Sequence, residues 1–315
     1  MKQADQLVSV VICTMGRPEV FGAALESVLA QDYGDFEVLV LDQSQDDGTE
    51  TIARKLAGDD SRVKYRRLDQ KGLSRAYNRG VEQARGELVA FTDDDCVAPQ
   101  GWLRAVADAF AREPEAELLY GQVLGPIDPR DERHGEGVIP TLPITRLERL
   151  SRRHGFRVFG MGANFATRRR AWERVGGFDE ILGGGGPLQS AQDFDYAYRV
   201  FLGGGTILLD PAVVVHHYGF RLNSEWPDTV GSYGIGVGGF YFKHIRAGDG
   251  YASFLFAFSL LKVVARMLKR QLLARPTGVQ RTYLRYVVAG VRKSLRFGVD
   301  RRLRLYYERG APATP

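Results

Sequence analysis

The chain has 315 residues, which is enough for one large domain or for a domain with an appendage. Its composition, 44% hydrophobic and 26% charged, is that of a globular protein and excludes a disordered or fibrous chain. The two cysteines, Cys13 and Cys96, exclude a disulfide framework and favour a reducing compartment.

No targeting or membrane-spanning segment is expected. MKQADQ leads directly into a strand-like run, without the basic and apolar regions of a signal peptide. The longest apolar stretch, residues 251–261, is about half of the ~20 residues that a bilayer-spanning helix needs.

The net charge of +5 is unevenly distributed. Residues 262–315 contain 14 Lys and Arg residues but only two acidic residues, Asp300 and Glu308, so the rest of the chain is net negative. A basic tail on an acidic body favours an anionic surface as the partner of the tail, either a membrane or a nucleic acid.

The first half of the chain alternates predicted strands and helices. The expected strands are residues 7–14, 36–42, 63–67, 87–92 and 117–123, and the expected helices are residues 18–31, 49–57, 73–84 and 101–112. This alternation predicts an α/β fold with a doubly wound, mostly parallel sheet and helices on both faces. With right-handed crossovers, the first three strands extend in one direction and the fourth returns beside the first. The ligand crevice is therefore expected at the carboxyl ends of the first and fourth strands.

The second half is less regular. Residues 125–157 are rich in Pro, Gly and charge and are expected to form a long surface excursion. The elements expected after it are a short strand and helix ending near residue 175, a glycine loop at 183–186, a helix within 190–201, and two short strands at 206–210 and 212–217. We expect a main domain of residues 1–245 and a basic amphipathic helical region of residues 246–315.

Three consecutive carboxylates, Asp93, Asp94 and Asp95, follow the fourth strand. Their mutual repulsion needs compensation from solvent, basic side chains or a bound cation. Because they lie at the predicted crevice, we favour a divalent cation, Mg²⁺ or Mn²⁺, that also binds phosphates. The alternative is a solvated loop in which one carboxylate caps the following helix.

Other polar side chains end neighbouring strands. Asp42 and Gln43 follow the second strand, where they could contact a base or ribose or could form an Asx turn. Arg17 and Arg75 follow the first and third strands, and guanidinium groups suit a diphosphate, although solvated arginines are common.

Asp193 has two interpretations. The pattern Ser190-x-x-Asp193 fits a helix capping box, which would make Asp193 structural. Alternatively, Asp193 is a general base at the start of a helix, below a mobile glycine loop.

His216 and His217 end the last predicted strand of the main domain. A neutral imidazole can bind a metal ion. Because adjacent residues on a strand point to opposite faces, at most one of the two can reach the site.

Several motifs in order resemble one family, the family 2 nucleotide-sugar glycosyltransferases with the GT-A fold. They are SVVICTMGRP, FEVLVLDQSQDDGT, KGLSRAYNRGVEQARGELVAFTDDDC, GANFATRRRAWERVGGFDE, QDFDYAYR and a strand ending in VHHYG. The resemblance covers about residues 7–245. It implies a metal-dependent enzyme that transfers a sugar, with inversion, from a nucleoside-diphosphate sugar to an acceptor hydroxyl.

The resemblance also implies roles for particular residues. The residues implied in donor binding are Thr14, Arg17, Asp42, Gln43, Arg75, Asp93 and Asp94. The implied ligands of Mn²⁺ or Mg²⁺ are Asp93 and Asp95, with His216 or His217 as a further ligand. Asp193 matches the catalytic base.

This sequence departs from the family pattern at three positions. Gln43 stands where many members have an aspartate that contacts uracil, which leaves the nucleobase open. Gln192 replaces a glutamate before the base, and Tyr77 replaces an arginine.

The expected acceptor is a saccharide or a lipid-linked molecule in polysaccharide, lipopolysaccharide or glycolipid assembly. The expected location is cytoplasmic, with peripheral attachment to the inner face of the plasma membrane through residues 254–273, which mix aromatics, leucines and basic residues. The alternative for this segment is a helical subdomain with a solvated basic face. Nucleic acid is not expected, because the aromatics alternate with leucines instead of forming a stacking platform.

Two other functions fit the sequence less well. A nucleotidyltransferase that makes nucleotide sugars would need a Gly-rich basic loop after the first strand, and MGRP is too short for one. A catalytically inactive scaffold is disfavoured by the presence of Asp93, Asp95 and Asp193.

Overall fold

The structure, a computed structural model, describes residues 6–128, 137–157 and 161–310. The chain divides into two compact units. Unit 1 comprises Met1–Lys71, Arg75–Phe178 and Tyr196–Leu222, and unit 2 comprises Gly72–Ser74, Asp179–Asp195 and Asn223–Pro315.

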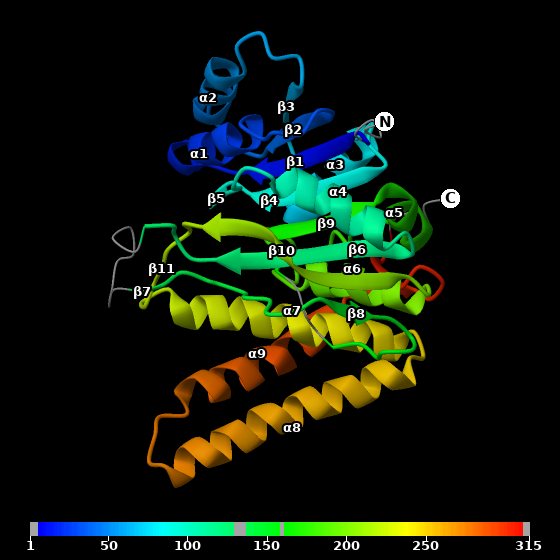
Figure 1. The fold of residues 1–315 in the computed structure, drawn as a ribbon. Helices are drawn as coiled ribbons and strands as arrows, with labels where there is room; N and C mark the ends of the chain where they lie inside the picture. Colours follow the sequence, from blue (N-terminus) through cyan, green and yellow to red (C-terminus); the bar gives the residue numbers. More distant parts are fainter. Residues whose placement is uncertain (1–5, 129–136, 158–160, 311–315) are drawn as a thin grey trace. The chain divides into compact units, whose positions relative to one another are not determined.

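Unit 1 is built on a nine-stranded sheet with the order β3-β2-β1-β4-β9-β6-β10-β5, in which β8 also pairs with β10 (Figure 1). The strands are β1 Val8–Thr14, β2 Phe36–Asp42, β3 Val63–Arg67, β4 Leu88–Asp93, β5 Cys96–Val97, β6 Ala116–Leu124, β8 Glu148–Leu150, β9 Asn164–Arg168 and β10 Thr206–His217. Strands β1 to β4 run parallel, as do β6 and β10, whereas β9 is antiparallel to β4 and β6. The mostly parallel sheet and the order of its first four strands agree with the sequence prediction.

Helices cover both faces of this sheet. They are α1 Pro18–Leu29, α2 Gly48–Ala57, α3 Leu73–Gln83, α4 Trp102–Arg112, α5 Arg169–Val175 and α6 Gln192–Leu202. Val10 and Ile12 of β1 pack with α1 and α4 in one apolar core. Val11 points to the opposite face, where a Cβ at Gly80 of α3 would lie 2.7 Å from its side chain. The strand is therefore buried on both sides, which explains its mostly apolar sequence.

The carboxyl ends of the central strands meet at one edge of the sheet. In the β1–β2 register Thr14 pairs with Asp42, and in the β1–β4 register Cys13 pairs with Asp93. The residues that follow β1, β2 and β4 are therefore neighbours, as the right-handed crossovers predict.

The second half of the chain differs from the prediction in two places. The two strands expected at 206–210 and 212–217 form one strand, β10, with a register shift between Asp210 and Val214. The carboxylate of Asp210 accepts a hydrogen bond from the Ala212 backbone at 2.8 Å, which stabilises the irregularity. The expected surface excursion includes β8 and the short strand β7 Gly137–Val138, which pairs with β11 Arg221–Leu222.

Unit 2 contains three long helices and a hairpin. The helices are α7 Trp226–Arg246, α8 Gly250–Leu272 and α9 Gly278–Ser294, and the hairpin strands are β12 Phe297–Asp300 and β13 Leu305–Glu308. Glycines allow α7 and α9 to approach closely, since a Cβ at Gly238 would lie 2.2 Å from the Val287 carbonyl and one at Gly290 would lie 2.1 Å from the Ile235 carbonyl.

Helix α8, in orange in Figure 1, is longer than its apolar core sequence suggests. Its 23 residues continue through Lys262 and Arg266, and by length and composition alone the helix could cross a membrane. Only 6% of the most apolar 18-residue stretch of this helix is buried. The expectation that no segment is long enough to span a membrane was wrong. Basic residues interrupt the apolar stretch after residue 261, but the helix continues through them to Leu272.

Candidate active site

Two carboxylates at the end of β4 are buried and share one arginine. Asp94 and Asp95 are almost fully buried, whereas the Arg17 side chain is 40% exposed. Nη1 of Arg17 donates to Oδ2 of Asp95 at 2.8 Å, and Nη2 pairs with Asp94. Burial raises the pKa of Asp94 to about 6, although the positive charge of Arg17 acts in the opposite direction. One partly solvated cation therefore faces two buried acids.

Antiparallel pairing of β5 with β10 brings a histidine to these acids. In that register His217 faces Cys96, the residue after Asp95. Nε2 of His217 lies 3.4 Å from Oδ1 of Asp95, and possible ligand atoms of Asp95, Cys96 and His217 all lie within 4.8 Å of one another. Burial lowers the pKa of His217, which favours the neutral imidazole that binds metals. Burial also raises the pKa of the Cys96 thiol, which disfavours the thiolate.

This cluster fits a divalent cation. Oδ1 of Asp95 and Nδ1 of His217 are buried and have no hydrogen-bond partner among the residues that the structure describes. Gly219 packs tightly against both side chains, because a Cβ there would lie 2.3 Å from Oδ2 of Asp95 and 2.7 Å from the His217 ring. A carboxylate with an imidazole suits a hard or borderline ion such as Mn²⁺.

The other predicted metal ligands lie differently. Nδ1 of His216 is 2.7 Å from the Gly125 carbonyl oxygen, and the residue faces away from the side that His217 takes. Asp93 is half-buried at the end of β4 and is not part of the Asp95–Cys96–His217 cluster.

Side-chain hydrogen bonds hold the end of β2. Asp42 is fully buried, and its carboxylate accepts hydrogen bonds from the Ser44 backbone at 2.8 Å, from the Ser44 hydroxyl and from the Tyr65 hydroxyl at 2.7 Å. The backbone of Gly16 in turn donates to the Ser44 hydroxyl at 2.7 Å. Asp42 thus holds the loop after β1 against the loop after β2, as the Asx-turn alternative suggested, and sequence reasoning missed Ser44 and Tyr65.

Gln43 and Arg75 lie near a polar pocket of unit 1. The backbone of Gln43 donates to Thr14 at 2.9 Å, and its side-chain amide donates to the Gln70 carbonyl at 2.5 Å. Gln70 and Arg75 line a pocket of about 550 Å³. The remaining lining residues are Arg66, Arg67, Leu68, Asp69, Arg79, Glu82 and Gln83. Arginines and amides in one pocket can bind an anionic, hydrogen-bonding ligand.

Asp193 lies on the first turn of α6 and is half-buried. Its Oδ1 accepts a hydrogen bond from the Phe194 backbone at 2.9 Å. Helix α6 begins at Gln192, and the hydroxyl of Ser190 donates to the Ser232 carbonyl of α7 at 2.9 Å. The glycine loop before it is braced by backbone hydrogen bonds, from Gly183 to Ser190 and from Leu188 to Ile181.

Two family departures have structural consequences. Tyr77 is buried in an aromatic cluster with Phe91, Phe165 and Phe178, so it belongs to the core of unit 1. Gln192 is buried at the start of α6.

Residues 9–176 match the sequence profile of Glycosyl transferase family 2, which is more than half of the chain. The chain belongs to this family. The matched segment includes Arg17, Asp95 and Arg75 and ends before Asp193 and His217.

Curated family members resemble part of the chain. A glucosyl-dolichyl phosphate glucuronosyltransferase of Haloferax volcanii is 31% identical over 119 residues, which is 37% of this chain and 38% of that protein. A GalNAc(5)-diNAcBac-PP-undecaprenol beta-1,3-glucosyltransferase of Campylobacter jejuni is 36% identical over 89 residues, which is 28% of this chain and 29% of that protein. The chain therefore spans well under half the length of these relatives.

Solved structures show the same fold. A mannosyltransferase from Pyrobaculum calidifontis, in complex with GDP-Man and Mn²⁺, has a TM-score of 0.61 at 20% identity over 93% of this chain and 88% of that chain. S. aureus TarS in complex with UDP-GlcNAc has a TM-score of 0.53 at 19% identity over 73% of this chain and 66% of that chain. The predicted GT-A fold is confirmed.

Proposed function

We propose that this family 2 protein transfers a sugar, with inversion, from a nucleoside-diphosphate sugar to the hydroxyl of a saccharide or lipid-linked acceptor. The observation that carries the proposal is the buried pair of Asp95 and His217 beyond the carboxyl end of β4. Nε2 of His217 lies 3.4 Å from Oδ1 of Asp95, and this oxygen has no hydrogen-bond partner among the described residues. In open α/β sheets that edge is where ligands bind.

On the donor side, Asp95 and His217 would hold the divalent cation, with Asp93 as a further carboxylate of the motif. A cation bound there would neutralise charge on the diphosphate as it leaves. Arg17 is partly exposed and can turn from the two carboxylates toward phosphate oxygens. The Pyrobaculum mannosyltransferase is in complex with Mn²⁺, which supports this choice of cation.

The nucleoside would contact the ends of β1 and β2. Gln43 offers an amide that can pair with a base edge, and Thr14 and the buried Asp42 shape the same strand ends. Arg75 would contribute a cation from the neighbouring pocket. The structural neighbours are in complex with GDP-Man and UDP-GlcNAc, so both a purine and a pyrimidine nucleotide belong in the test.

On the acceptor side, Asp193 would take the proton from the attacking hydroxyl. Its position on the first turn of α6 leaves part of the side chain accessible. A helix N-terminus stabilises a nearby carboxylate, which is the form of the side chain that accepts a proton.

The test is a thermal-shift panel of nucleoside diphosphates and nucleotide sugars with and without Mn²⁺, followed by assay of the products of the best ligand. We expect stabilisation by one base type that requires Mn²⁺, and release of nucleoside diphosphate when an acceptor is added. Release of pyrophosphate from a nucleoside triphosphate would instead identify a nucleotidyltransferase.

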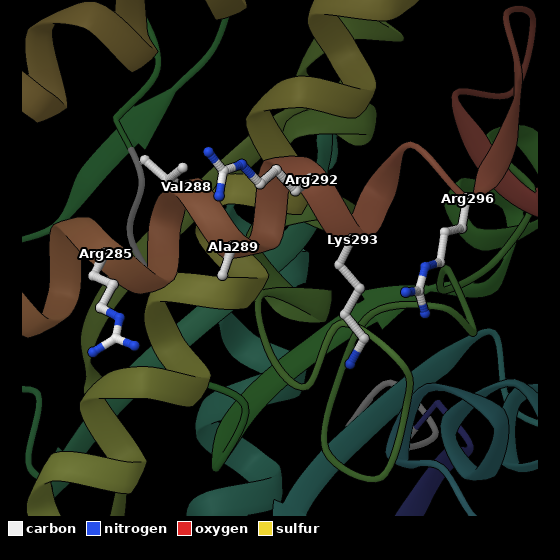
Figure 2. Close-up of a pocket in the computed structure, with 6 residues that line it drawn as sticks. All are labelled: Arg285, Val288, Ala289, Arg292, Lys293 and Arg296. Atoms are coloured by element: carbon white, nitrogen blue, oxygen red, sulfur yellow. The ribbon is translucent and has the colours of Figure 1, made fainter.

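We further propose that unit 2 attaches the protein peripherally to the anionic inner face of the plasma membrane. Along α8 large apolar side chains are exposed, including Phe254 at 61% and Leu272 at 88%. Along α9 a pocket of about 580 Å³ is lined by Arg285, Val288, Ala289, Arg292, Lys293 and Arg296 (Figure 2). The four cations form no ion pair with any residue in the described part of the chain. Apolar and unpaired basic side chains together suit anionic lipid.

Sedimentation with vesicles containing anionic lipid tests this attachment. We expect salt-dependent binding that Arg292→Glu/Arg296→Glu weakens by about tenfold or more, since each cation near the surface contributes about 1 kcal/mol. The control Arg301→Glu/Arg302→Glu makes the same charge change outside the α9 pocket. Equal losses of vesicle binding in both variants would contradict a specific role of the pocket. If the protein does not bind vesicles at low salt, the alternative of a helical subdomain with a solvated basic face is favoured.

A further inference from the structure

A buried charge network in unit 2 connects α7 with the first turn of α6. Nζ of Lys243 lies 2.5 Å from Oδ2 of Asp179 and 2.6 Å from Oδ1 of Asp195. The next residue, His244, places Nε2 2.9 Å from the same Oδ1 of Asp195. Lys243, His244 and Asp195 have no exposed surface. The backbone of Tyr306 also donates to Asp179, at 2.9 Å.

Such a network contributes little net stability to a protein. Burying a lysine and two carboxylates costs desolvation that well-packed apolar side chains of similar size would avoid. Unlike an apolar core, an ionic network fixes the orientation of its side chains, because each carboxylate oxygen must face its hydrogen-bond donor. The network fixes where the Asp195 carboxylate lies relative to α7.

The segment before α6 needs to be held in place. Gln189 and Ala191 have positive φ angles of 65° and 70°, which non-glycine residues rarely adopt. Such conformations persist only where the surroundings impose them, and they concentrate at functional sites.

Helix α7 supplies those surroundings. Its glycines contact the segment directly, since a Cβ at Gly236 would lie 2.0 Å from Oγ of Ser190 and one at Gly239 would lie 2.6 Å from Leu188. The carbonyl of Ser232 accepts the hydrogen bond from the Ser190 hydroxyl. One helix therefore holds the strained segment through its glycines and the first turn of α6 through Lys243 and His244.

We propose that Lys243 and His244 are positioning residues for Asp193. Successive residues on a helix are about 100° apart, so Asp195 and Asp193 point in nearly opposite directions. By holding Asp195 toward α7, the network turns the Asp193 carboxylate outward and fixes its orientation. Proton transfer depends on that orientation, and a displacement of about 1 Å can cost about 10²-fold in rate. This inference rests on the proposed role of Asp193 as the base.

The test variant is Asp179→Asn/Lys243→Met, which removes one charge of each sign and leaves Asp195 paired with His244. We expect kcat to fall about tenfold or more while the KM of the donor and nucleotide binding stay unchanged. The matched control is Glu37→Gln/Lys64→Met. It removes a buried carboxylate and its lysine partner at the start of β2, in unit 1. We expect the control to keep its kcat.

The decisive measurement repeats the single-turnover comparison in an Asp193→Asn background. A positioning role predicts that Asp179→Asn/Lys243→Met then causes no further loss, because the group that it positions is gone. Equal losses in both backgrounds would overturn the positioning role alone. Near-normal turnover of Asp193→Asn by itself would overturn the proposed base, and the positioning role with it.

If the double variant does not fold, as judged by its thermal transition, His244→Leu replaces it. This change keeps Lys243 between both carboxylates and removes only the imidazole contact. We expect a loss of kcat of a few-fold that disappears in the Asp193→Asn background. An unchanged kcat in His244→Leu would overturn the proposal.

Discussion

Two clusters of buried acids in this chain differ in how completely their charges are compensated. At the end of β4, Asp94 and Asp95 share a partly exposed Arg17, and Oδ1 of Asp95 has no hydrogen-bond partner in the described part of the chain. In unit 2, Asp179 and Asp195 share the fully buried Lys243 and receive additional donors from Tyr306 and His244.

We interpret this difference as that between a proposed ligand site and a structural support. Buried oxygens that the protein leaves without donors are costly unless a ligand pairs with them. Oxygens that already have donors fix geometry and have little capacity left for a ligand. Aspartates of similar burial therefore have opposite expected roles, and mutation should separate them.

The largest expected effect comes from Asp95→Ala. This change removes the carboxylate with the free oxygen, so we expect Mn²⁺-dependent stabilisation by nucleoside diphosphate to disappear in a thermal-shift assay. Asp179→Asn is the comparison, because it changes a compensated acid and should leave that stabilisation in place. Unchanged Mn²⁺-dependent nucleotide affinity in Asp95→Ala would contradict the metal role.

The next effect separates the two adjacent histidines. His217→Ala should weaken Mn²⁺ binding about 10- to 100-fold, the scale of a lost or misoriented ligand group at a metal site. His216→Ala should leave Mn²⁺ affinity nearly unchanged, because its ring contacts the Gly125 carbonyl instead. Calorimetric titration with Mn²⁺ measures both. A larger loss of Mn²⁺ affinity in His216→Ala than in His217→Ala would contradict the assignment of His217 as the metal ligand.

The smallest expected effect concerns Glu37, a third buried acid whose charge is compensated by hydrogen-bond donors. Burial alone would raise its pKa, but hydrogen bonds from Lys64, Arg85 and Ser9 lower the pKa to about 2. An acid with a lowered folded pKa stabilises the protein above its unfolded pKa, and this stabilisation is lost as pH falls from about 4.5 to about 2.

Glu37→Gln should therefore lower the free energy of unfolding near pH 7 by about 2 kcal/mol, a figure reduced for the solvent screening of its partly exposed partners. Urea unfolding at several pH values measures this change. The difference from the unmutated protein should shrink toward pH 3, and a difference that stays constant with pH would contradict the assigned pKa.

Local patterns allowed much of the fold to be predicted. β1, β2 and β4 are mostly apolar because these strands are buried on both faces, and the helix after β1 keeps a clear apolar stripe. Alternation and crossover handedness then give the strand order, which places Asp93 to Asp95 at the sheet edge.

The unpredicted features depend on contacts between distant residues. Strand β5 has only two residues, and no local pattern shows that it pairs with the end of β10 and so brings His217 to Asp95 and Cys96. The Lys243 network is similar. Its only signal in the sequence is a Lys-His pair at the end of a Gly-rich apolar segment, which is equally typical of a basic helix C-terminus.

Sugar transfer with Asp193 as the base is tested most directly by single-turnover kinetics of Asp193→Asn with the identified donor and Mn²⁺. We predict donor affinity within about twofold of the unmutated protein and a transfer rate lower by about 10²-fold or more, the scale of a lost general base. Near-normal transfer by Asp193→Asn would contradict this role and the proposed mechanism.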